Sequence, residues 1–304
     1  MKQSFVNILL SLFIVCFITS CNVLKRVNDN EQLLVQNTLL IDGKKEKSED
    51  LNSLIYQQPN NKLLLGIPLR LHIYNLARPD RDSLFDAWLN ENPKRKERLI
   101  KRYSKKQVDK LKESAISFNN WLKKTGEAPV VIDTVRANRT KRNLEKYYYK
   151  NGWFNREVTY SIDSLGKQRA AITYKVDRKS PYIIDSISTK IGSPIIDSLY
   201  QLNKSESLLK VGDQFRDANY ANERDRLTSV FRNSGAYHFS QDYITFENDT
   251  ILPKDHVNVE VQIANRIIRN EDSVAHVPFK LYKIKEVNII TDENAQNQGT
   301  AFSD

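Results

Sequence analysis

The stretch LEKYYYKNGWF at residues 144–154 occurs a second time, in altered form, as LTSVFRNSGAY at residues 227–237. Each copy has a leucine, an aromatic residue four positions later and a glycine eight positions after the leucine. Residues four apart lie on one face of a helix, and glycine adopts the left-handed conformation that commonly ends one. The two copies therefore predict two helices that end at Gly152 and Gly235, with a repeat distance of 83 residues (144 to 227).

Apolar residues alternate on both sides of each predicted helix, a pattern that is typical of β-strands with one buried face. After the first copy, Val158, Tyr160 and Ile162 alternate, and AAITYKV follows beyond a turn; the second copy has DYITFEN and HVNVEVQI in the same places. Upstream, the segments LLVQNTLLIDG, PYIIDSISTKI and FKLYKIKEVNII are each predicted to form a strand. The repeated unit is thus a strand, a helical region, a helix that ends in glycine, and two further strands.

The N-terminus has the pattern of an exported protein. Lys2 precedes an apolar run over residues 5–18, which is too short to span a membrane but is typical of a signal peptide. The sequence ITSC that closes this run resembles a lipobox. We therefore expect a lipoprotein signal peptide at residues 1–20, which is removed, and an acyl anchor on Cys21 that holds the protein to a membrane.

The alternative to lipidation is a plain secretory peptide with an incidental cysteine. The only other cysteine, Cys16, lies in the part that is removed, so the mature chain would have no partner for Cys21 in a disulfide. Residues 21–32 are expected to form a tether. Since no aspartate follows Cys21, we expect the lipid anchor in the outer membrane of a Gram-negative bacterium, facing the periplasm.

The net charge of +10 comes from the half of the chain nearest this anchor. Residues 21–150 carry 27 Lys and Arg against 16 Asp and Glu, whereas residues 151–304 carry 19 against 21. Export excludes nucleic acid as a partner, so a basic helix here predicts either a face near anionic lipid headgroups or a solvated face without a partner. The basic residues that could face a membrane are Lys94, Arg95, Lys96, Arg98, Lys101, Arg102, Lys105 and Lys106. The apolar positions expected on the other face of this helix are Leu99, Tyr103, Val108, Leu111, Ala115, Phe118 and Leu122.

The tandem order β-α-α-β-β, together with VGDQFRDANYANERDRLTSVFRNSGAY, resembles the POTRA domains of the BamA/TamA outer-membrane-protein assembly family. The segments NNKLLLGIPLRLHIYNLARP and WLKKTGEAPVVID resemble its lipoprotein, TamA-like (TamL) branch. The resemblance implies an α+β fold of tandem POTRA-like units, each a three-stranded sheet covered by two helices.

Applied to this sequence, the resemblance implies three units. The first covers residues 33–177 and has a large helical insertion at about residues 58–126; the second covers residues 180–265. Residues 277–304 are expected to begin an incomplete third unit. Members of the family normally continue into a membrane-embedded barrel, so the sequence is either a fragment of a longer protein, which we expect, or a chain that has lost its barrel.

The implied function is periplasmic binding of unfolded outer-membrane proteins, or of an assembly-machine partner, by β-augmentation, in which an extended chain adds a strand to a sheet edge. The family's proposed mechanism uses the second strand of each unit, here residues 156–163 and 240–247. The partner-binding residues we expect on these edges are Val158, Tyr160, Ile162, Tyr243 and Thr245. The alternative is a lipid-anchored scaffold that docks one fixed partner.

No catalytic residues are expected. His72, His238, His256 and His276 lack metal-ligand spacing, and the sequence contains no P-loop, no G-x-S-x-G motif and no cysteine nucleophile. The sequence therefore predicts a binding protein without a metal or another cofactor, and not an enzyme.

Overall fold

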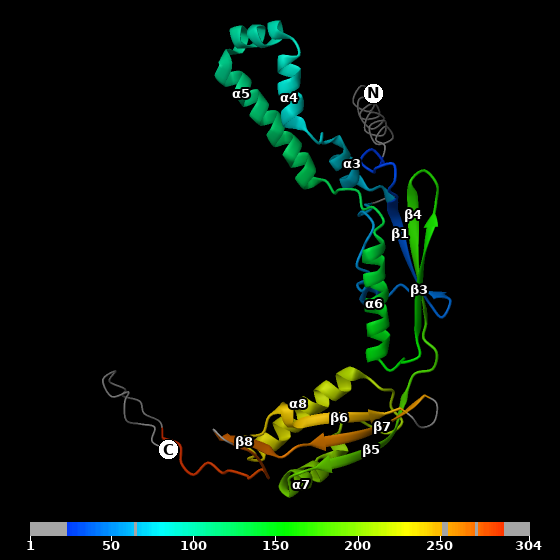
Figure 1. The fold of residues 1–304 in the computed structure, drawn as a ribbon, viewed down its shortest axis with the longest axis vertical. Coiled ribbons are helices and arrows are strands. Elements are labelled where there is room, and N and C mark those ends of the chain that lie inside the picture. Colours follow the sequence, from blue (N-terminus) through cyan, green and yellow to red (C-terminus); the bar gives the residue numbers. More distant parts are fainter. Residues whose placement is uncertain (1–22, 64–65, 251–254, 271–272, 289–304) are drawn as a thin grey trace, which may run out of the picture. The chain divides into compact units, whose positions relative to one another are not determined.

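The computed structural model describes residues 23–63, 66–250, 255–270 and 273–288. The chain divides into two compact units, one formed by residues up to 147 with 156–179, and the other by residues 148–155 with those from 180 onward. Both units combine small β-sheets with helices, so the expected α+β class is confirmed (Figure 1). The predicted signal peptide, Cys21 and residues 289–304 lie outside the described residues.

The sheet of the first unit is built around a parallel pair of strands. β1 (Leu33–Ile41) runs parallel to β4 (Arg169–Asp177), and β3 (Glu157–Ser164) runs antiparallel along the other side of β4. A two-residue strand, β2 (Lys44–Lys45), pairs with the end of β1 through a tight turn at Gly43, whose φ is +78°. The strand order is therefore β2-β1-β4-β3, one short strand more than the expected three.

Two helices accompany this sheet in the repeated part of the unit. α2 (Glu49–Asn52) is a single turn, and α6 (Thr134–Lys150) is a long helix that lies along the strands (Figure 1). Leu144 of α6 is fully buried, as are Ile172 and Tyr174 of β4. The core of the unit thus lies between α6 and one face of the sheet.

The second unit has the expected three strands and two helices. β5 (Ile183–Ile191) runs parallel to β7 (His256–Ile263), which pairs on its other side with the antiparallel strand β6 (Ile244–Asp249). The connections contain α7 (Pro194–Leu202), α8 (Asp217–Asn233) and the 3₁₀ turns η2 (Lys204–Glu206) and η3 (Gln241–Tyr243). A buried cluster joins the two helices to the sheet and comprises Ile196, Tyr200, Leu227, Phe231, Ala236, Phe239, Ile244, Val261, Ile263 and Phe279.

The 83-residue repeat is confirmed in the positions and packing of α6 and α8. The helices begin at residues 134 and 217 and end at residues 150 and 233. The paired residues Leu144 and Leu227 are both fully buried. Each helix is followed by the predicted glycine in the left-handed region, with φ of +87° at Gly152 and +100° at Gly235.

The first strand of each unit carries a β-bulge at the same place. The register against the last strand shifts between Leu34 and Gln36 in β1, and between Ile184 and Ser186 in β5. A bulge inserts one unpaired residue and bends the strand. The two units thus also share a β-bulge in the first strand, which the alternation of apolar residues in the sequence does not predict.

The insertion in the first unit is helical, as expected. It contains α3 (Leu69–Leu76), α4 (Arg81–Asn90) and α5 (Pro93–Thr125), and α4 and α5 pack as a helical hairpin (Figure 1). The helical path of α5 is broken at Ser104, where φ is +61°. Beyond this break the Ser104 hydroxyl donates to the Gln107 side-chain oxygen at 3.4 Å.

The predicted apolar face of α5 is partly wrong. Val108 and Leu122 are buried, but Leu111 and Phe118 are 52% and 61% exposed. Asn119, and not Phe118, lies on the buried face of α5. The side-chain oxygen of Asn119 accepts from the Arg78 N–H at 2.7 Å, and its side-chain N–H donates to the Arg78 carbonyl at 2.9 Å. Because Asn119 hydrogen-bonds to the backbone of the facing segment, a polar residue fits where the hydrophobic pattern predicted an aromatic one.

The region after β7 also differs from expectation. β8 (Arg266–Asn270) pairs antiparallel with β9 (Ser273–Val277), two strands that the sequence pattern did not predict. The following described residues, 278–288, form no helix or strand, although a strand was predicted there. Phe279 packs into the core of the second unit, whereas Ile284 is 84% exposed.

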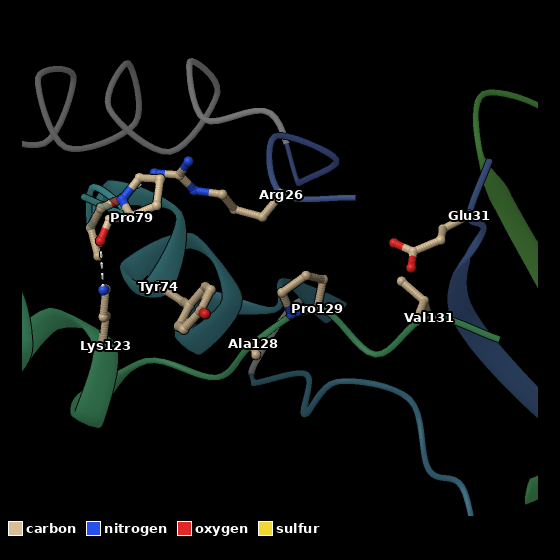
Figure 2. A pocket seen from close by; sticks show the side chains of 9 residues that line it. Arg26, Glu31, Tyr74, Pro79, Lys123, Ala128, Pro129 and Val131 are labelled. Carbon is tan, nitrogen blue, oxygen red and sulfur yellow. Dashed lines mark hydrogen bonds between the residues drawn. The ribbon is translucent and has the colours of Figure 1, made fainter. Parts of the chain in front are cut away.

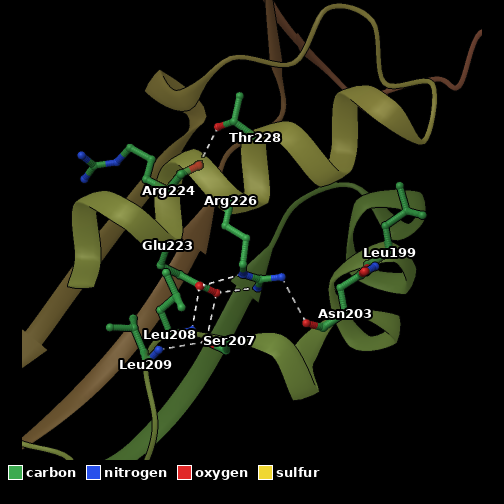
Figure 3. A network of polar contacts seen from close by, with 9 residues as sticks. All are labelled: Leu199, Asn203, Ser207, Leu208, Leu209, Glu223, Arg224, Arg226 and Thr228. Atoms are coloured by element: carbon green, nitrogen blue, oxygen red, sulfur yellow. Dashed lines mark hydrogen bonds and ion pairs between the residues drawn. The ribbon is translucent and has the colours of Figure 1, made fainter. Parts of the chain in front are cut away.

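A buried polar contact is repeated in both units. Thr140 of α6 is fully buried and its hydroxyl accepts from the Tyr56 N–H at 2.9 Å. Glu223, 83 residues later, is 1% exposed and accepts from the Leu208 N–H at 2.9 Å (Figure 3). In each unit, the long helix, α6 or α8, thus holds in place part of the chain that connects the first strand of the unit to that helix.

The Glu223 contact is the more elaborate of the two. Its carboxylate also accepts from the Ser207 hydroxyl at 2.9 Å and pairs with Arg226 at 2.7 Å (Figure 3). The hydrogen bonds that Arg226 donates to the Glu223 carboxylate raise the pKa of the guanidinium above its usual value. Arg226 in turn donates to the Asn203 carbonyl at 3.3 Å, which extends the network to the end of α7.

We predict that Glu223→Ala lowers the free energy of unfolding of the second unit by about 3 kcal/mol, because it leaves a largely buried guanidinium and two donors without their acceptor. Amide hydrogen exchange of α7 and α8 in the variant would measure this. Glu206→Ala, at an exposed position nearby, is the control and should change protection by less than about 0.5 kcal/mol. Equal protection in the two variants would contradict the prediction.

Candidate functional site

The outer edge of β1 in the first unit is already paired over much of its length. The Leu34 N–H donates to the Val130 carbonyl at 2.8 Å, and near the other end the Glu46 N–H donates to the Leu39 carbonyl at 2.9 Å. Between them, the Lys62 ammonium donates to the Val35 carbonyl at 2.9 Å. The opposite edge of the sheet is β3, which no described strand covers.

Turn geometry determines which main-chain groups of β3 face outward. The Leu165 N–H donates to the Arg169 carbonyl at 2.8 Å, so these opposed residues form a hydrogen-bonded pair at the hairpin end. In an antiparallel ladder, hydrogen-bonded and non-hydrogen-bonded pairs alternate. With the observed register, the N–H and C=O groups of Val158, Tyr160 and Ile162 therefore point away from β4, toward the open edge.

The side chains of the same three residues lie on the core face of the sheet. Their cross-strand partners on β4 are Val176, Tyr174 and Ile172, which are all buried. Val158 is 3% exposed and Ile162, near the hairpin end, is 36% exposed. The outward-facing part of these residues is thus chiefly their backbone, and a strand edge of this kind is able to pair with an extended polypeptide of almost any sequence.

The second unit repeats this arrangement. The outer edge of β5 begins paired with a loop, since the Ile184 N–H donates to the Asp213 carbonyl at 2.9 Å and the Phe215 N–H donates to the Tyr182 carbonyl at 2.9 Å. β6 forms the opposite edge. Neither β3 nor β6 contains a proline or a lysine, two residues that natural edge strands use to prevent pairing.

The residues predicted on the second edge need correction. Tyr243 lies in the turn η3 and not in β6; its ring packs against Phe239 and Phe279 with centroids 5.8 and 5.0 Å away. Thr245 is in β6, but its main chain faces β7, because the Ala264 N–H donates to the Tyr243 carbonyl at 3.0 Å and the pairs alternate from there.

By the same alternation, the outward main-chain groups of β6 belong to Ile244, Phe246 and Asn248. The Ile244 carbonyl is engaged, since it accepts from the Arg224 guanidinium at 3.1 Å. The sequence could have located this edge correctly only if the 3₁₀ turn before it had been recognised.

The helical hairpin of the insertion has an unusual surface. Of the eight predicted basic residues, all except Arg95 are exposed, and Arg95 bonds to Glu91 at 3.1 Å and lies 5.0 Å from the Trp88 ring centroid. Among them lie large apolar side chains that contact water: Leu84, Trp88, Ile100, Tyr103, Leu111, Phe118 and Trp121. The Phe118 and Trp121 rings are stacked with centroids 5.8 Å apart. Exposed tryptophans among lysines and arginines are typical of helices that lie on membrane surfaces.

Val23, Lys25 and Val27 contact the base of this insertion. Asn75 of α3 is buried and donates to the Val23 carbonyl at 3.3 Å, and the Lys25 ammonium donates to the Asn75 carbonyl at 3.1 Å. Val27 packs against Leu71 of the same helix. The tether is thus bound to α3 from two residues after the predicted lipid anchor.

Beside this tether lies a cavity of about 390 Å³ (Figure 2). The Arg26 guanidinium bonds to the Ala77 carbonyl at its rim, and the Lys123 ammonium donates to the Pro79 carbonyl at 3.1 Å. Tyr74 and Pro129 form part of its apolar wall (Figure 2).

Within the described residues, no helix is both long enough and apolar enough to cross a membrane. The same part of the chain contains no cluster of three or more His, Cys, Asp or Glu side chains that could hold a metal ion.

Comparison with known proteins gives similarity only at the level of solved structures. No protein-family model and no curated protein matches the sequence. BamA POTRA3-5 from Haemophilus influenzae is similar over 78% of this chain and 68% of its own, with 11% identity and a TM-score of 0.33. BamA from Haemophilus ducreyi lacking POTRA domains 1-3 is similar over 47% of this chain and 25% of its own, with 12% identity and a TM-score of 0.30.

POTRA1-3 of the periplasmic domain of Omp85 from Anabaena is similar over 79% of this chain and 97% of its own, with 13% identity and a TM-score of 0.25. Superpositions this poor carry no argument about function. The order β-α-α-β-β rests on the strands and helices of this chain itself.

Proposed function

We propose that this chain is the periplasmic, lipid-anchored POTRA region of an outer-membrane protein assembly or translocation factor. It binds unfolded outer-membrane proteins, or partner proteins, by adding an extended segment to the open edges of its sheets. The observation that carries the proposal is the repeated pairing pattern, in which the first strand is covered by a loop and the middle strand in sequence, β3 or β6, has an open edge.

The energy available at these edges suits a transient holder. A main-chain hydrogen bond contributes about 1 kcal/mol net, so a client strand that makes four to six of them gains roughly 4–6 kcal/mol. That corresponds to a Kd between about 1 mM and tens of micromolar before ordering of the client is counted. Such binding recognises the backbone and allows release to the next step of assembly.

We predict that the double variant Ile162→Pro/Asn248→Pro binds an unfolded outer-membrane porin about tenfold more weakly than the unchanged chain. Both positions have outward N–H groups, so proline removes a donor to the client without removing a bond to β4 or β7. Fluorescence anisotropy of the labelled porin, diluted from urea into detergent-free buffer, measures the Kd.

The matched control is Ile162→Ala/Asn248→Ala, which shortens the same side chains and keeps both donors; it should bind as the unchanged chain does. Equal loss of affinity in the alanine and proline variants would contradict augmentation and assign the effect to side chains. Failure of every form to bind the porin would favour the scaffold with one fixed partner.

The proposal also includes contact with the membrane through the helical hairpin. If Cys21 is acylated, the tether fixed on α3 holds the insertion within a few residues of the lipid. The exposed basic side chains can then meet anionic headgroups, each contributing up to about 1 kcal/mol, while the exposed tryptophans enter the interface.

We predict that the chain without residues 1–21 still binds vesicles containing phosphatidylglycerol, and that reversing Lys101, Arg102, Lys105 and Lys106 to Glu weakens this at least tenfold. Co-sedimentation measures it. In the control variant, Lys44, Lys45, Lys167 and Lys190 are changed to Glu. These four lysines are exposed and lie outside the hairpin, and the control variant has the same net charge as the hairpin variant. Equal loss in both variants would show that only net charge matters, and the hairpin would then lack a specific role.

We predict that the full chain, expressed in a Gram-negative host, incorporates palmitate and that Cys21→Ala does not. Lipobox processing requires the thiol as the acceptor of the diacylglyceryl group, so its loss removes all label. The label in the two proteins is compared by autoradiography of membrane fractions. Unchanged labelling of the variant would exclude Cys21 as the lipid anchor.

A further inference from the structure

The glycines that end α6 and α8 make the same contact with the chain that follows them. The Gly152 carbonyl accepts from the Tyr182 N–H at 2.8 Å, and the Gly235 carbonyl accepts from the Tyr282 N–H at 2.8 Å. The two glycines are 83 residues apart and the two tyrosines are 100 apart, which matches the offsets of the repeated helices and of the repeated PYIIDSISTKI and FKLYKIKEVNII segments. Residues 152, 182, 235 and 282 all belong to the second unit.

At Gly152 this junction is filled by residues 212–215. The Phe215 N–H donates to the Tyr182 carbonyl at 2.9 Å, and the Gln214 side chain donates to the Asn151 carbonyl at 2.5 Å. The Phe215 carbonyl lies so close to Gly152 that a Cβ there would meet it at 2.5 Å. The Phe215 ring packs against the Phe154 ring with centroids 5.0 Å apart.

At Gly235 the corresponding space is open. A cavity of about 520 Å³ is lined by residues 232–235, Tyr237 and residues 282–284. Tyr237 stands 83 residues after Phe154, and it is 67% exposed. Ile284 stands 100 residues after the core residue Ile184; the first is 84% exposed and the second 1% exposed. No described segment of the chain fills this cavity.

We propose that this cavity, the Gly235 site, binds an extended Gly-Asp-x-aromatic segment of a further repeat unit, in the way that residues 212–215 bind at Gly152. The aromatic ring of the segment packs on Tyr237. Its backbone N–H donates to the Tyr282 carbonyl, and its own carbonyl lies against Gly235, where any side chain would obstruct it. Ile284 then becomes part of a buried strand.

The lining of the Gly235 site defines the segment further. Arg232 and Lys283 line the cavity, so an acidic residue next to the glycine of the segment, like Asp213 at the Gly152 site, is favoured by charge. The Lys150–Asp217 ion pair at 2.8 Å has no counterpart, because Asn233 stands at the position of Lys150. An acid two residues after the aromatic residue is therefore not required.

Docking also requires a local change at Tyr282. Its carbonyl now turns toward Gly235, where a Cβ would lie 2.6 Å from it, whereas the Tyr182 carbonyl accepts from Phe215. The Tyr282–Lys283 peptide must therefore rotate when the segment binds, and the Lys283 amide reports this rotation directly.

The test is a titration of the full isotope-labelled chain with a synthetic peptide of residues 210–219, KVGDQFRDAN, followed by amide chemical shifts. We expect saturable shifts at Gly235, Tyr237 and residues 282–284, the largest at Lys283, with a Kd in the millimolar range or below. A peptide with alanine at its phenylalanine should bind at least tenfold more weakly.

Tyr237→Ala should weaken the peptide's binding at least fivefold, since it removes the ring on which the phenylalanine packs. Leu202→Ala, at a position 78% exposed on α7, is the matched control and should leave the Kd unchanged. Because both side chains are exposed, neither variant disturbs the core. Shifts at Gly152 and Tyr182 in place of Gly235, equal binding of the alanine peptide, or no shifts at several millimolar peptide would each overturn the proposal.

The Gly235 site lies outside β3 and β6, so this test is independent of client binding. The Ile162→Pro/Asn248→Pro variant should bind the peptide as the unchanged chain does. Loss of porin binding with retained peptide binding in that variant would support both proposals separately.

Discussion

Each sheet depends on the parallel pairing of its first and last strands. β1 with β4, and β5 with β7, can run parallel only if the chain returns to the end of the sheet where the first strand began, and the antiparallel middle strand, β3 or β6, makes that return. The strand that comes last in the sequence, β4 or β7, lies between the other two. The strand before it, β3 or β6, therefore lies at an edge of the sheet and pairs on one side only. The open edges of β3 and β6 thus follow from the strand order and need no special sequence of their own.

The sequence predicted the repeated part of the fold because the same physical demands occur twice in it. A leucine, an aromatic residue and a glycine at spacings of four and eight positions fix a buried helix face and its end, and two copies make the pattern hard to obtain by chance. Where the chain departs from simple periodicity, prediction failed. Asn119 takes a buried position on α5 because it pairs with the backbone of Arg78, and no hydrophobic pattern contains that information.

The edges were predicted unequally for a related reason. Val158, Tyr160 and Ile162 follow Gly152 through a short turn and lie in the strand that alternation predicted, where their main chain faces outward. After Gly235, the additional turn η3 shifts the start of β6, and Tyr243 becomes a core-packing residue. A single 3₁₀ turn before a strand thus changes which of its residues have an outward-facing main chain, although the hydrophobic pattern is the same in both units. The tether's attachment to α3 through Asn75 depends on a contact between segments about 50 residues apart, which one sequence does not reveal.

The bulges in β1 and β5 affect how the sheets respond to an added strand. A regular strand can slide past its neighbour by two residues and keep its inward and outward faces. A bulge removes that freedom, because the extra residue fits only one register and sliding would leave it opposite an unbulged partner. The first strand of each sheet is therefore locked in one register, and under the proposed function a segment added at β3 or β6 would leave that register unchanged.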